Sequence, residues 1–168
     1  LGDHGLWCKH TDYEQAVRSP LIIAGPGVAA GAVSSSLVET IDLGPTLLAR
    51  AGVPVPAAMA GRDLSPILAD PRAQVHAAVF HCYPCTVDGV RVLGRAVRDD
   101  RYRLVLWQRQ DDGATLAREL YDLDADPGET VNRAGQAEHV ETESLLAALI
   151  AAQGPARPQV KAGAKAGD

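Results

Sequence analysis

The first ten residues, LGDHGLWCKH, hold five side chains that can take part in chemistry: Asp3, His4, Cys8, Lys9 and His10. A lysine on a glycine-containing loop can bind a sulfate or phosphate oxygen as a point charge. Lys9 is therefore the first candidate for an anion-binding residue. Its spacing alone favours an ordinary surface lysine, because lysines are almost always exposed to solvent.

Asp3 and His4 are residue types that bind divalent metal ions. A tight Gly-Asp-His-Gly turn held by hydrogen bonds from the aspartate side chain explains the same residues equally well. Two adjacent residues cannot complete a coordination sphere, and no cluster rich in Asp and Asn elsewhere could finish it. His10 is not at helical spacing from His4, and nothing marks either as a base. We predict no metal ligand in this chain.

The three cysteines are an odd number, which excludes a complete disulfide framework. Cys82 and Cys85 follow His81 in a C-x-x-C arrangement, but a structural zinc site needs a second pair of ligands. A redox pair would need a thioredoxin-like context, which is missing. A local disulfide and two unlinked thiols both stay open. Cys8 has no clearly paired base and is a poor candidate for a nucleophile.

The 168 residues, with 46% hydrophobic and 22% charged side chains, are typical of one globular domain. The net charge of -5 and the scattered Lys and Arg residues argue against nucleic acid as a partner. No apolar run approaches the ~20 residues that span a bilayer, so we expect no membrane partner. The cellular compartment is not assigned.

The elements that must position these side chains begin with two extended segments. We expect a strand over 16–24, ended by the turn Gly25-Pro26-Gly27, and a second extended piece over 33–38. Asp42 is expected to cap a helix that Gly52 ends. The spacing predicts that this helix buries one apolar face, made of Leu43, Leu47, Leu48 and Ala51.

From residue 77 onward the pattern changes to period two, which is typical of strands. An irregular segment over 54–71, with a helical turn at 66–68, leads into this region. We expect a strand over 77–82, two strands joined by a turn at Asp99-Asp100, and a fourth strand over 117–123. A second turn is expected at 111–113 and a helix over 140–152. The last residues lack a core-forming pattern, and we expect them to be disordered.

Several stretches of the sequence, taken together, resemble the sulfatase family, which is part of the alkaline-phosphatase-like superfamily. "LGDHGLWCKHTDYEQAVRSPLIIAGPG" is similar to the family's segment after its Asp-His-Gly metal motif. "VETIDLGPTLLARAGVPVP", "GRDLSPIL" and "RELYDLDADPGETVN" resemble later family segments in the same order, up to about residue 149. The pattern looks most similar to the branch of iduronate-2-sulfatase and choline-sulfatase.

The resemblance implies an α/β fold that is the C-terminal part of a sulfatase and ends in a small antiparallel sheet packed by one helix. Residues 1–71 would form the end of the catalytic domain. Residues 72–152 would form the antiparallel-sheet subdomain with its terminal helix, and 153–168 a disordered tail. Because the chain begins without Met and lacks the family's upstream motifs, we expect it to be a fragment whose partner is the missing N-terminal part of the same enzyme.

Lys9 matches the family's active-site lysine, which implies a catalytic and substrate-binding role on a sulfate oxygen. His4 matches a histidine that lies beside the family's site, and His10 shares its loop, so both are candidate substrate-binding residues. The family uses calcium and a formylglycine nucleophile made within C/S-x-P-x-R. That pentapeptide does not occur here. Both would come from upstream sequence, and we expect this chain alone to be inactive.

The expected activity is hydrolysis of a sulfate ester on a sugar or a small alcohol. One alternative is a phosphodiesterase or phosphonate hydrolase of the same superfamily, because both reactions handle a tetrahedral anion. The other is a non-catalytic remnant that serves as an interaction module.

Overall fold

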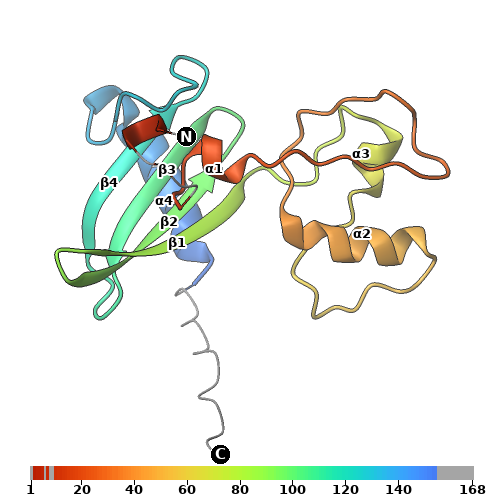
Figure 1. Ribbon diagram of the computed structural model, residues 1–168, viewed down its shortest axis with the longest axis horizontal. Coiled ribbons are helices and arrows are strands. Elements are labelled where there is room, and N and C mark those ends of the chain that lie inside the picture. Colours follow the sequence, from red (N-terminus) through yellow and green to blue (C-terminus); the bar gives the residue numbers. More distant parts are fainter. Residues whose placement is uncertain (1, 6, 8–9, 155–168) are drawn as a thin grey trace, which may run out of the picture.

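A computed structural model describes residues 2–5, 7 and 10–154 of the chain. Figure 1 shows two halves: one holds a four-stranded sheet and helix α4 (Val140–Ala152), and the other holds α2 (Leu43–Arg50) and α3 (Ser65–Ala69) between long loops. Across the described residues, no helix has the length and apolar character needed to cross a membrane.

The sheet is an antiparallel meander in which each strand pairs with the next one in the sequence. Its strands are β1 (Val79–Val87), β2 (Val90–Arg98), β3 (Tyr102–Arg109) and β4 (Thr115–Asp122). The expected turn at Asp99 is confirmed, and its carboxylate accepts the backbone N–H of Tyr102 at 2.6 Å.

Strand β1 runs further than the sequence pattern predicts. Asp88 and Gly89 both have positive φ, 50° and 78°, and they join Val87 to its partner Val90 in a two-residue hairpin loop. Asp-Gly is the preferred dipeptide for such a loop, since both central residues must take left-handed conformations. This local signal was missed, and it adds five residues to the strand.

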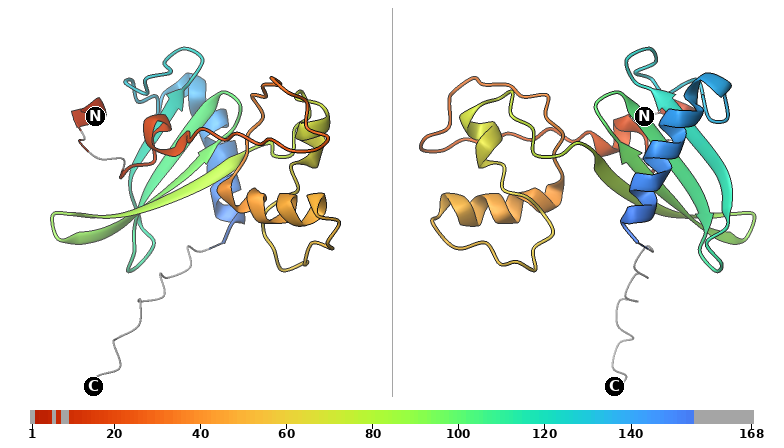
Figure 2. Two further views of the ribbon diagram at one scale, coloured as in Figure 1. Left: turned by 45° about the vertical axis from the view of Figure 1, so that its right-hand side comes forward. Right: turned by 180° about the vertical axis from the view of Figure 1, so that it is seen from behind.

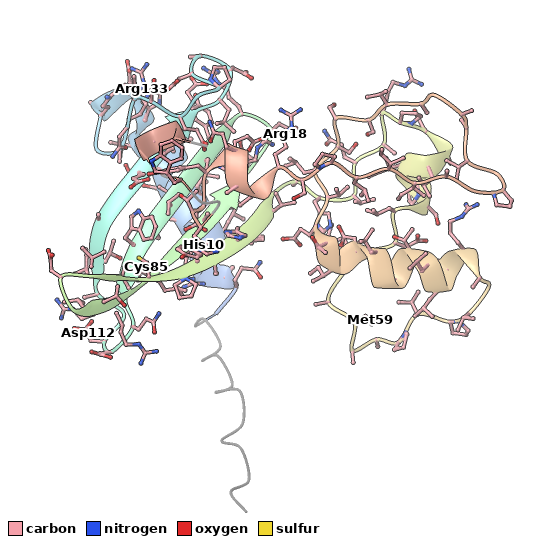
Figure 3. The ribbon with its side chains drawn as sticks, viewed as in Figure 1. His10, Arg18, Met59, Cys85, Asp112 and Arg133 are labelled. Atoms are coloured by element: carbon pink, nitrogen blue, oxygen red, sulfur yellow. The ribbon has the colours of Figure 1, made fainter. Side chains whose placement is uncertain are left out.

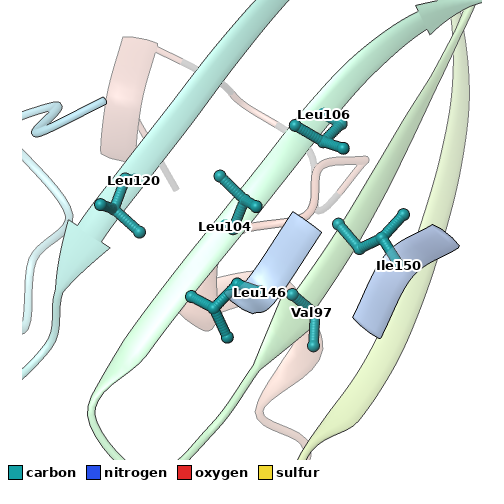
Figure 4. Close-up of a cluster of buried hydrophobic side chains, with 6 residues drawn as sticks. All are labelled: Val97, Leu104, Leu106, Leu120, Leu146 and Ile150. Atoms are coloured by element: carbon teal, nitrogen blue, oxygen red, sulfur yellow. The ribbon is translucent and has the colours of Figure 1, made fainter. Parts of the chain in front are cut away.

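One face of the sheet carries the hydrophobic core, and helix α4 covers this face (Figure 2). Figure 4 shows the buried cluster, which consists of Val97, Leu104, Leu106, Leu120, Leu146 and Ile150. The predicted helix over 140–152 is confirmed to the residue. The small antiparallel sheet packed by one helix is therefore present as expected.

The opposite face of the sheet, which we call the polar face, carries His81, Arg103 and Glu119 beside the buried Ala96 and Val105, and the N-terminal segment lies against it. The cross-strand register His81–Ala96–Val105–Glu119 places these four residues on one face, since side chains alternate along a strand. The segment over 10–17, which includes helix α1 (Glu14–Val17), contacts this face through side-chain hydrogen bonds.

Arg103 of β3 is buried and holds the N-terminal segment in place with three separate contacts. Its Nε donates to Glu129 Oε1 at 2.6 Å, its Nη1 donates to the carbonyl oxygen of Asp12 at 2.9 Å, and its Nη2 pairs with the Glu14 carboxylate. Glu129 in turn accepts the backbone N–H of Glu14 at 2.6 Å. We call Arg103, Glu14 and Glu129 the buried clamp.

The two strands expected before residue 40 do not form. Residues 18–24 and 33–38 carry no strand assignment, because no neighbouring backbone within the described residues pairs with them. Ile22 is 90% exposed and Val33 is 87% exposed, so both segments also lack the burial that a strand in an α/β sheet would have.

Asp42 does not cap α2 as expected. The 3-10 turn η2 (Thr40–Asp42) precedes the helix, and it turns the Asp42 carboxylate back toward Glu39, whose N–H it accepts at 2.7 Å. The same carboxylate accepts the N–H of Arg62 at 2.8 Å and lies 2.9 Å from His76 Nε2. Asp42 therefore joins three loops of this half.

The buried face predicted for α2 is also wrong. Pro45 and Thr46 are the buried residues, whereas Leu47 and Ala51 are exposed and Leu43 and Leu48 are only partly covered. The helical turn expected at 66–68 is confirmed as α3.

The α4 face provides a direct test of the core. Leu146 is 2% exposed and its neighbour Leu145 is 64% exposed, so the two leucines form a matched pair. We expect Leu146→Ala to lower the free energy of unfolding by about 2–5 kcal/mol, because it opens a cavity in the core. Leu145→Ala should change it little, and equal effects in urea unfolding would contradict this packing.

The buried clamp predicts a second stability effect. Arg103→Met leaves the buried Glu129 without its cation and removes one of the cations that pair with Glu14, which should cost about 3–5 kcal/mol of unfolding free energy. Arg109→Met is the control, because Arg109 forms only a solvent-exposed pair with Asp112. Unfolding curves that do not distinguish the two variants would show that the clamp is not formed.

Asp122 predicts an effect at acid pH. Its carboxylate accepts hydrogen bonds from Arg101 Nε at 3.0 Å and Nη2 at 2.6 Å, which lower the pKa of Asp122 to about 2. A carboxyl whose pKa is lower in the folded state stabilises the fold above its unfolded pKa near 4 and loses this contribution as the pH falls toward 2. Asp122→Asn should flatten the loss of stability between these pH values. Asp111→Asn, at an exposed position, should not.

Candidate functional site

Two of the three predicted site residues lie against the polar face of the sheet. The His4 ring stacks on Tyr13 with 4.2 Å between ring centroids, and the His10 ring stacks on Tyr83 of β1 at 5.8 Å. Figure 3 shows His10 beside β1. Lys9, the predicted catalytic residue, lies outside the described residues, as does Cys8.

Tyr13, which supports His4, belongs to a hydrogen-bonded aromatic group centred on Glu119. The hydroxyls of Tyr13 and Tyr121 donate to Glu119 Oε2 at 3.0 and 3.1 Å, and the Trp107 indole donates to Oε1 at 2.9 Å. Burial and the Glu119 charge raise the pKa of Tyr13 to about 12. Its phenol therefore stays protonated and keeps donating at neutral pH, which fixes the surface beneath His4.

A second group, Asp12 and His81, lies beside His10. Asp12 is fully buried, and its Oδ1 is 2.5 Å from Nδ1 of His81, whose side chain is 41% exposed. Oδ2 of Asp12 has no hydrogen-bond partner among the described residues. The geometry is that of a buried carboxylate that orients a partly open imidazole.

The close approach of Asp12 to the sheet requires a glycine at position 94. A Cβ on Gly94 would lie 2.1 Å from Asp12 Oδ2 and 2.8 Å from Cζ3 of Trp107. Gly94 is the cross-strand partner of both Tyr83 and Trp107, so it lies at the centre of the polar face. Its missing side chain makes the space into which the Asp12 carboxylate fits.

Asp12, His81 and Glu119 were not identified from the sequence as site residues. Asp12 and His81 are 69 positions apart, and no short spacing links them. The available signal was the polar residue next to an apolar core residue, such as Arg103 beside Leu104 and Glu119 beside Leu120, which marks a sheet face that the core does not cover.

Glu39, Asp42 and His76 are grouped as metal ligands often are, with one ligand atom of each within 4.8 Å of the others. Their oxygens already accept protein donors: Asp42 Oδ2 accepts from Glu39 N and lies against His76, and Glu39 Oε1 accepts the N–H of Phe80 at 2.8 Å. The cluster therefore ties loops together. It does not suit calcium, which takes six to eight oxygen ligands.

Cys82 and Cys85 are both free thiols on β1. Three residues apart on a strand, they point to opposite faces, so the local disulfide considered from the sequence does not form. Burial raises the pKa of both thiols, which favours the unreactive protonated form.

A cleft of about 910 Å³ separates the sheet from the loops of the other half. His81, Phe80 and Arg98 line its sheet wall, and Leu21 and Val33 line the wall opposite. Of the residues discussed above, His81 lines this cleft, and its partner Asp12 lies behind it.

Comparison with known proteins places this arrangement among the sulfatases. Residues 2–153 match the family described as N-sulphoglucosamine sulphohydrolase, C-terminal. The chain is 33% identical over 155 residues to N-acetylglucosamine-6-O-sulfatase of Bacteroides thetaiotaomicron, covering 89% of this chain and 27% of the relative. It is 29% identical over 139 residues to human arylsulfatase K, covering 77% of this chain and 25% of the relative.

Solved structures agree with the sequence comparison. A structure described as a complex with its substrate D-glucosamine-2-N,6-O-disulfate superposes with a TM-score of 0.75 at 31% identity, covering 90% of this chain and 31% of that one. A structure described as a 2-O GAG sulfatase superposes with a TM-score of 0.62 at 33% identity, covering 76% and 27%.

The chain spans about a quarter of the length of the curated relatives named above. Within that span the order of the motifs, the antiparallel sheet with its helix and the family match all agree. The chain therefore belongs to the sulfatase family and corresponds to the C-terminal portion of its members.

Proposed function

We propose that this chain is part of an enzyme that hydrolyses the sulfate ester of a sugar. The observation that carries the proposal is the superposition, over 90% of the chain, on a protein whose structure holds a sulfated glucosamine as its substrate. The likeness to an N-acetylglucosamine-6-O-sulfatase supports the same class of substrate.

In this proposal Lys9 binds a sulfate oxygen. Its ammonium offsets the negative charge that develops on the sulfate group as the ester bond breaks, and such a preorganised charge accelerates the reaction. The buried clamp and the Asp12 carboxylate support this role indirectly, because they fix the segment that begins at His10, directly after Lys9.

His4 and His10 are proposed to bind the substrate beside Lys9. The His10 ring lies on Tyr83 of β1, and the His4 ring lies on Tyr13 of the N-terminal segment, which Glu119 holds. Rings supported in this way lose little conformational freedom when a ligand binds, which favours affinity.

The nucleophile and the calcium ion are proposed to come from residues outside this chain. Within the sequence, the stretch Cys82-Tyr83-Pro84-Cys85-Thr86 has Thr86 where the formylglycine motif requires an arginine. The described residues offer no oxygen cluster that fits calcium, because the carboxylates of Glu39 and Asp42 are already occupied.

Residues 1–71 are proposed to complete the catalytic domain of the enzyme, and residues 72–152 to form a subdomain attached to it. Exposed apolar side chains gather in the first region, among them Ile22, Val33 and Leu47. Monomeric soluble proteins rarely expose contiguous apolar surface of large extent. The rest of the same enzyme, which accounts for about three quarters of the relatives' length, is the proposed partner for this surface.

The proposal is tested by sulfate release from N-acetylglucosamine-6-sulfate and from 4-nitrophenyl sulfate, in the longer enzyme that contains these residues. Lys9→Ala should lower kcat by about a hundredfold or more, as loss of a preorganised charge does at other sites. Arg109→Ala is the control and should have no effect, because Arg109 forms a solvent-exposed pair with Asp112.

Three results would contradict the proposal. Hydrolysis of a phosphodiester without sulfate release would favour the phosphoesterase alternative. A longer protein that folds but hydrolyses neither the sulfate ester nor the phosphodiester would favour an interaction module. Sulfate release by the 168 residues alone would place a nucleophile within this chain.

A further inference from the structure

We propose that His81, oriented by Asp12, binds a ring hydroxyl of the sugar that carries the sulfate ester. This inference rests on the proposed function and assigns a residue of the C-terminal subdomain to substrate recognition. His81 is remote in sequence from the loop of the family motif, and the fold brings it to the same face.

One ring nitrogen of His81 is available to bind a ligand. An ionised carboxylate can only accept hydrogen bonds, so the Nδ1 that lies 2.5 Å from Asp12 Oδ1 carries a proton and donates it to that bond. Nε2 is then the atom left for a ligand. It has no hydrogen-bond partner among the residues that the structure describes.

A comparison within the chain separates His81 from a purely structural histidine. His76 also pairs with an aspartate, Asp42, but its side chain is only 7% exposed. The His81 side chain is 41% exposed and lines the cleft. Two Asp–His pairs of similar geometry therefore differ in access, and only the His81 pair presents a ring edge to solvent.

His81 lies close to His10 on the polar face. His81 and Tyr83 lie two residues apart on the same face of β1, which separates them by about 7 Å along the strand. His10 stacks on Tyr83, so His81 and His10 are neighbours on this face. A sugar residue bound at His10 can reach His81 without any movement of the sheet.

The charged side chains near His81 favour a neutral hydroxyl as its ligand. Arg98 and Arg103 lie close to His81 on the sheet, but both pair with the Glu14 carboxylate, and Arg103 also pairs with Glu129. The charges of Arg98 and Arg103 are therefore balanced by the two glutamates. The third arginine of the cleft, Arg18, has an 81% exposed side chain and lies 3.9 Å from the same Glu14 carboxylate. A hydroxyl both donates and accepts, so it can bind Nε2 in either protonation state of the imidazole.

The test uses the longer enzyme and compares His81→Ala and Asp12→Asn with the wild type on N-acetylglucosamine-6-sulfate. We expect KM to rise about tenfold for His81→Ala with kcat nearly unchanged, as loss of a hydrogen bond to bound substrate predicts. Asp12→Asn should raise KM by less, because the amide oxygen still accepts from Nδ1. Cys82→Ser, next along β1 with its side chain on the α4 face, is the control.

A second substrate separates recognition from folding. 4-Nitrophenyl sulfate has no sugar hydroxyl, so its kcat/KM should be unchanged in His81→Ala. Equal losses of kcat/KM on both substrates would overturn the inference and assign His81 a structural contact only. A lower Tm of His81→Ala is expected in either case, because the variant leaves the buried Asp12 without its partner. A wild-type enzyme that hydrolyses neither substrate would instead remove the proposed function, and this inference with it.

Discussion

The buried guanidinium of Arg103 is the contact on which the arrangement of this molecule depends. It joins three parts of the chain: the segment after the family motif, strand β3 and the turn that carries Glu129. Burying a charged side chain is costly unless its partners are present, so the three parts are stable only together. The segment that holds Asp12 and Tyr13 takes its position from this contact.

The polar face of the sheet follows from the same constraint. A four-stranded sheet with one helix buries only the face that the helix covers, which here holds Leu104, Leu120 and Leu146. The other face is left to side chains that need hydrogen-bond partners, and the N-terminal segment supplies these partners. The same alternation that builds the core therefore also builds the candidate site.

The sequence predicted the C-terminal half well because its signals are local. Period-two alternation, the Asp99 turn and the apolar residues of α4 each depend on neighbours a few positions away. The first half was predicted poorly, because the burial of Leu21, Ile22 or Val33 depends on neighbours that the described residues do not contain. The apolar character of these residues was read correctly, but a strand needs a partner to form.

The residues of the candidate site also differ in whether a local signal in the sequence predicts them. Its loop was recognisable from a contiguous motif, which is how His4 and His10 were identified. Asp12 and His81 were missed because their pairing depends on the register of β1, on Gly94 and on a docked N-terminal segment. Each of these is set by contacts between residues far apart in the sequence, which residue types and short spacings do not encode.

The clamp also has a consequence for the order in which the chain acquires its structure. The three hairpins of the meander close over short distances in sequence, whereas Glu14 must wait for Arg103 and Glu129, about 90 and 115 positions later. During synthesis the segment that holds Glu14 leaves the ribosome before β3 and the turn that carries Glu129, so it can dock only after that turn has emerged. Among these segments, the one that is made before the sheet therefore reaches its final contacts only after the sheet has formed.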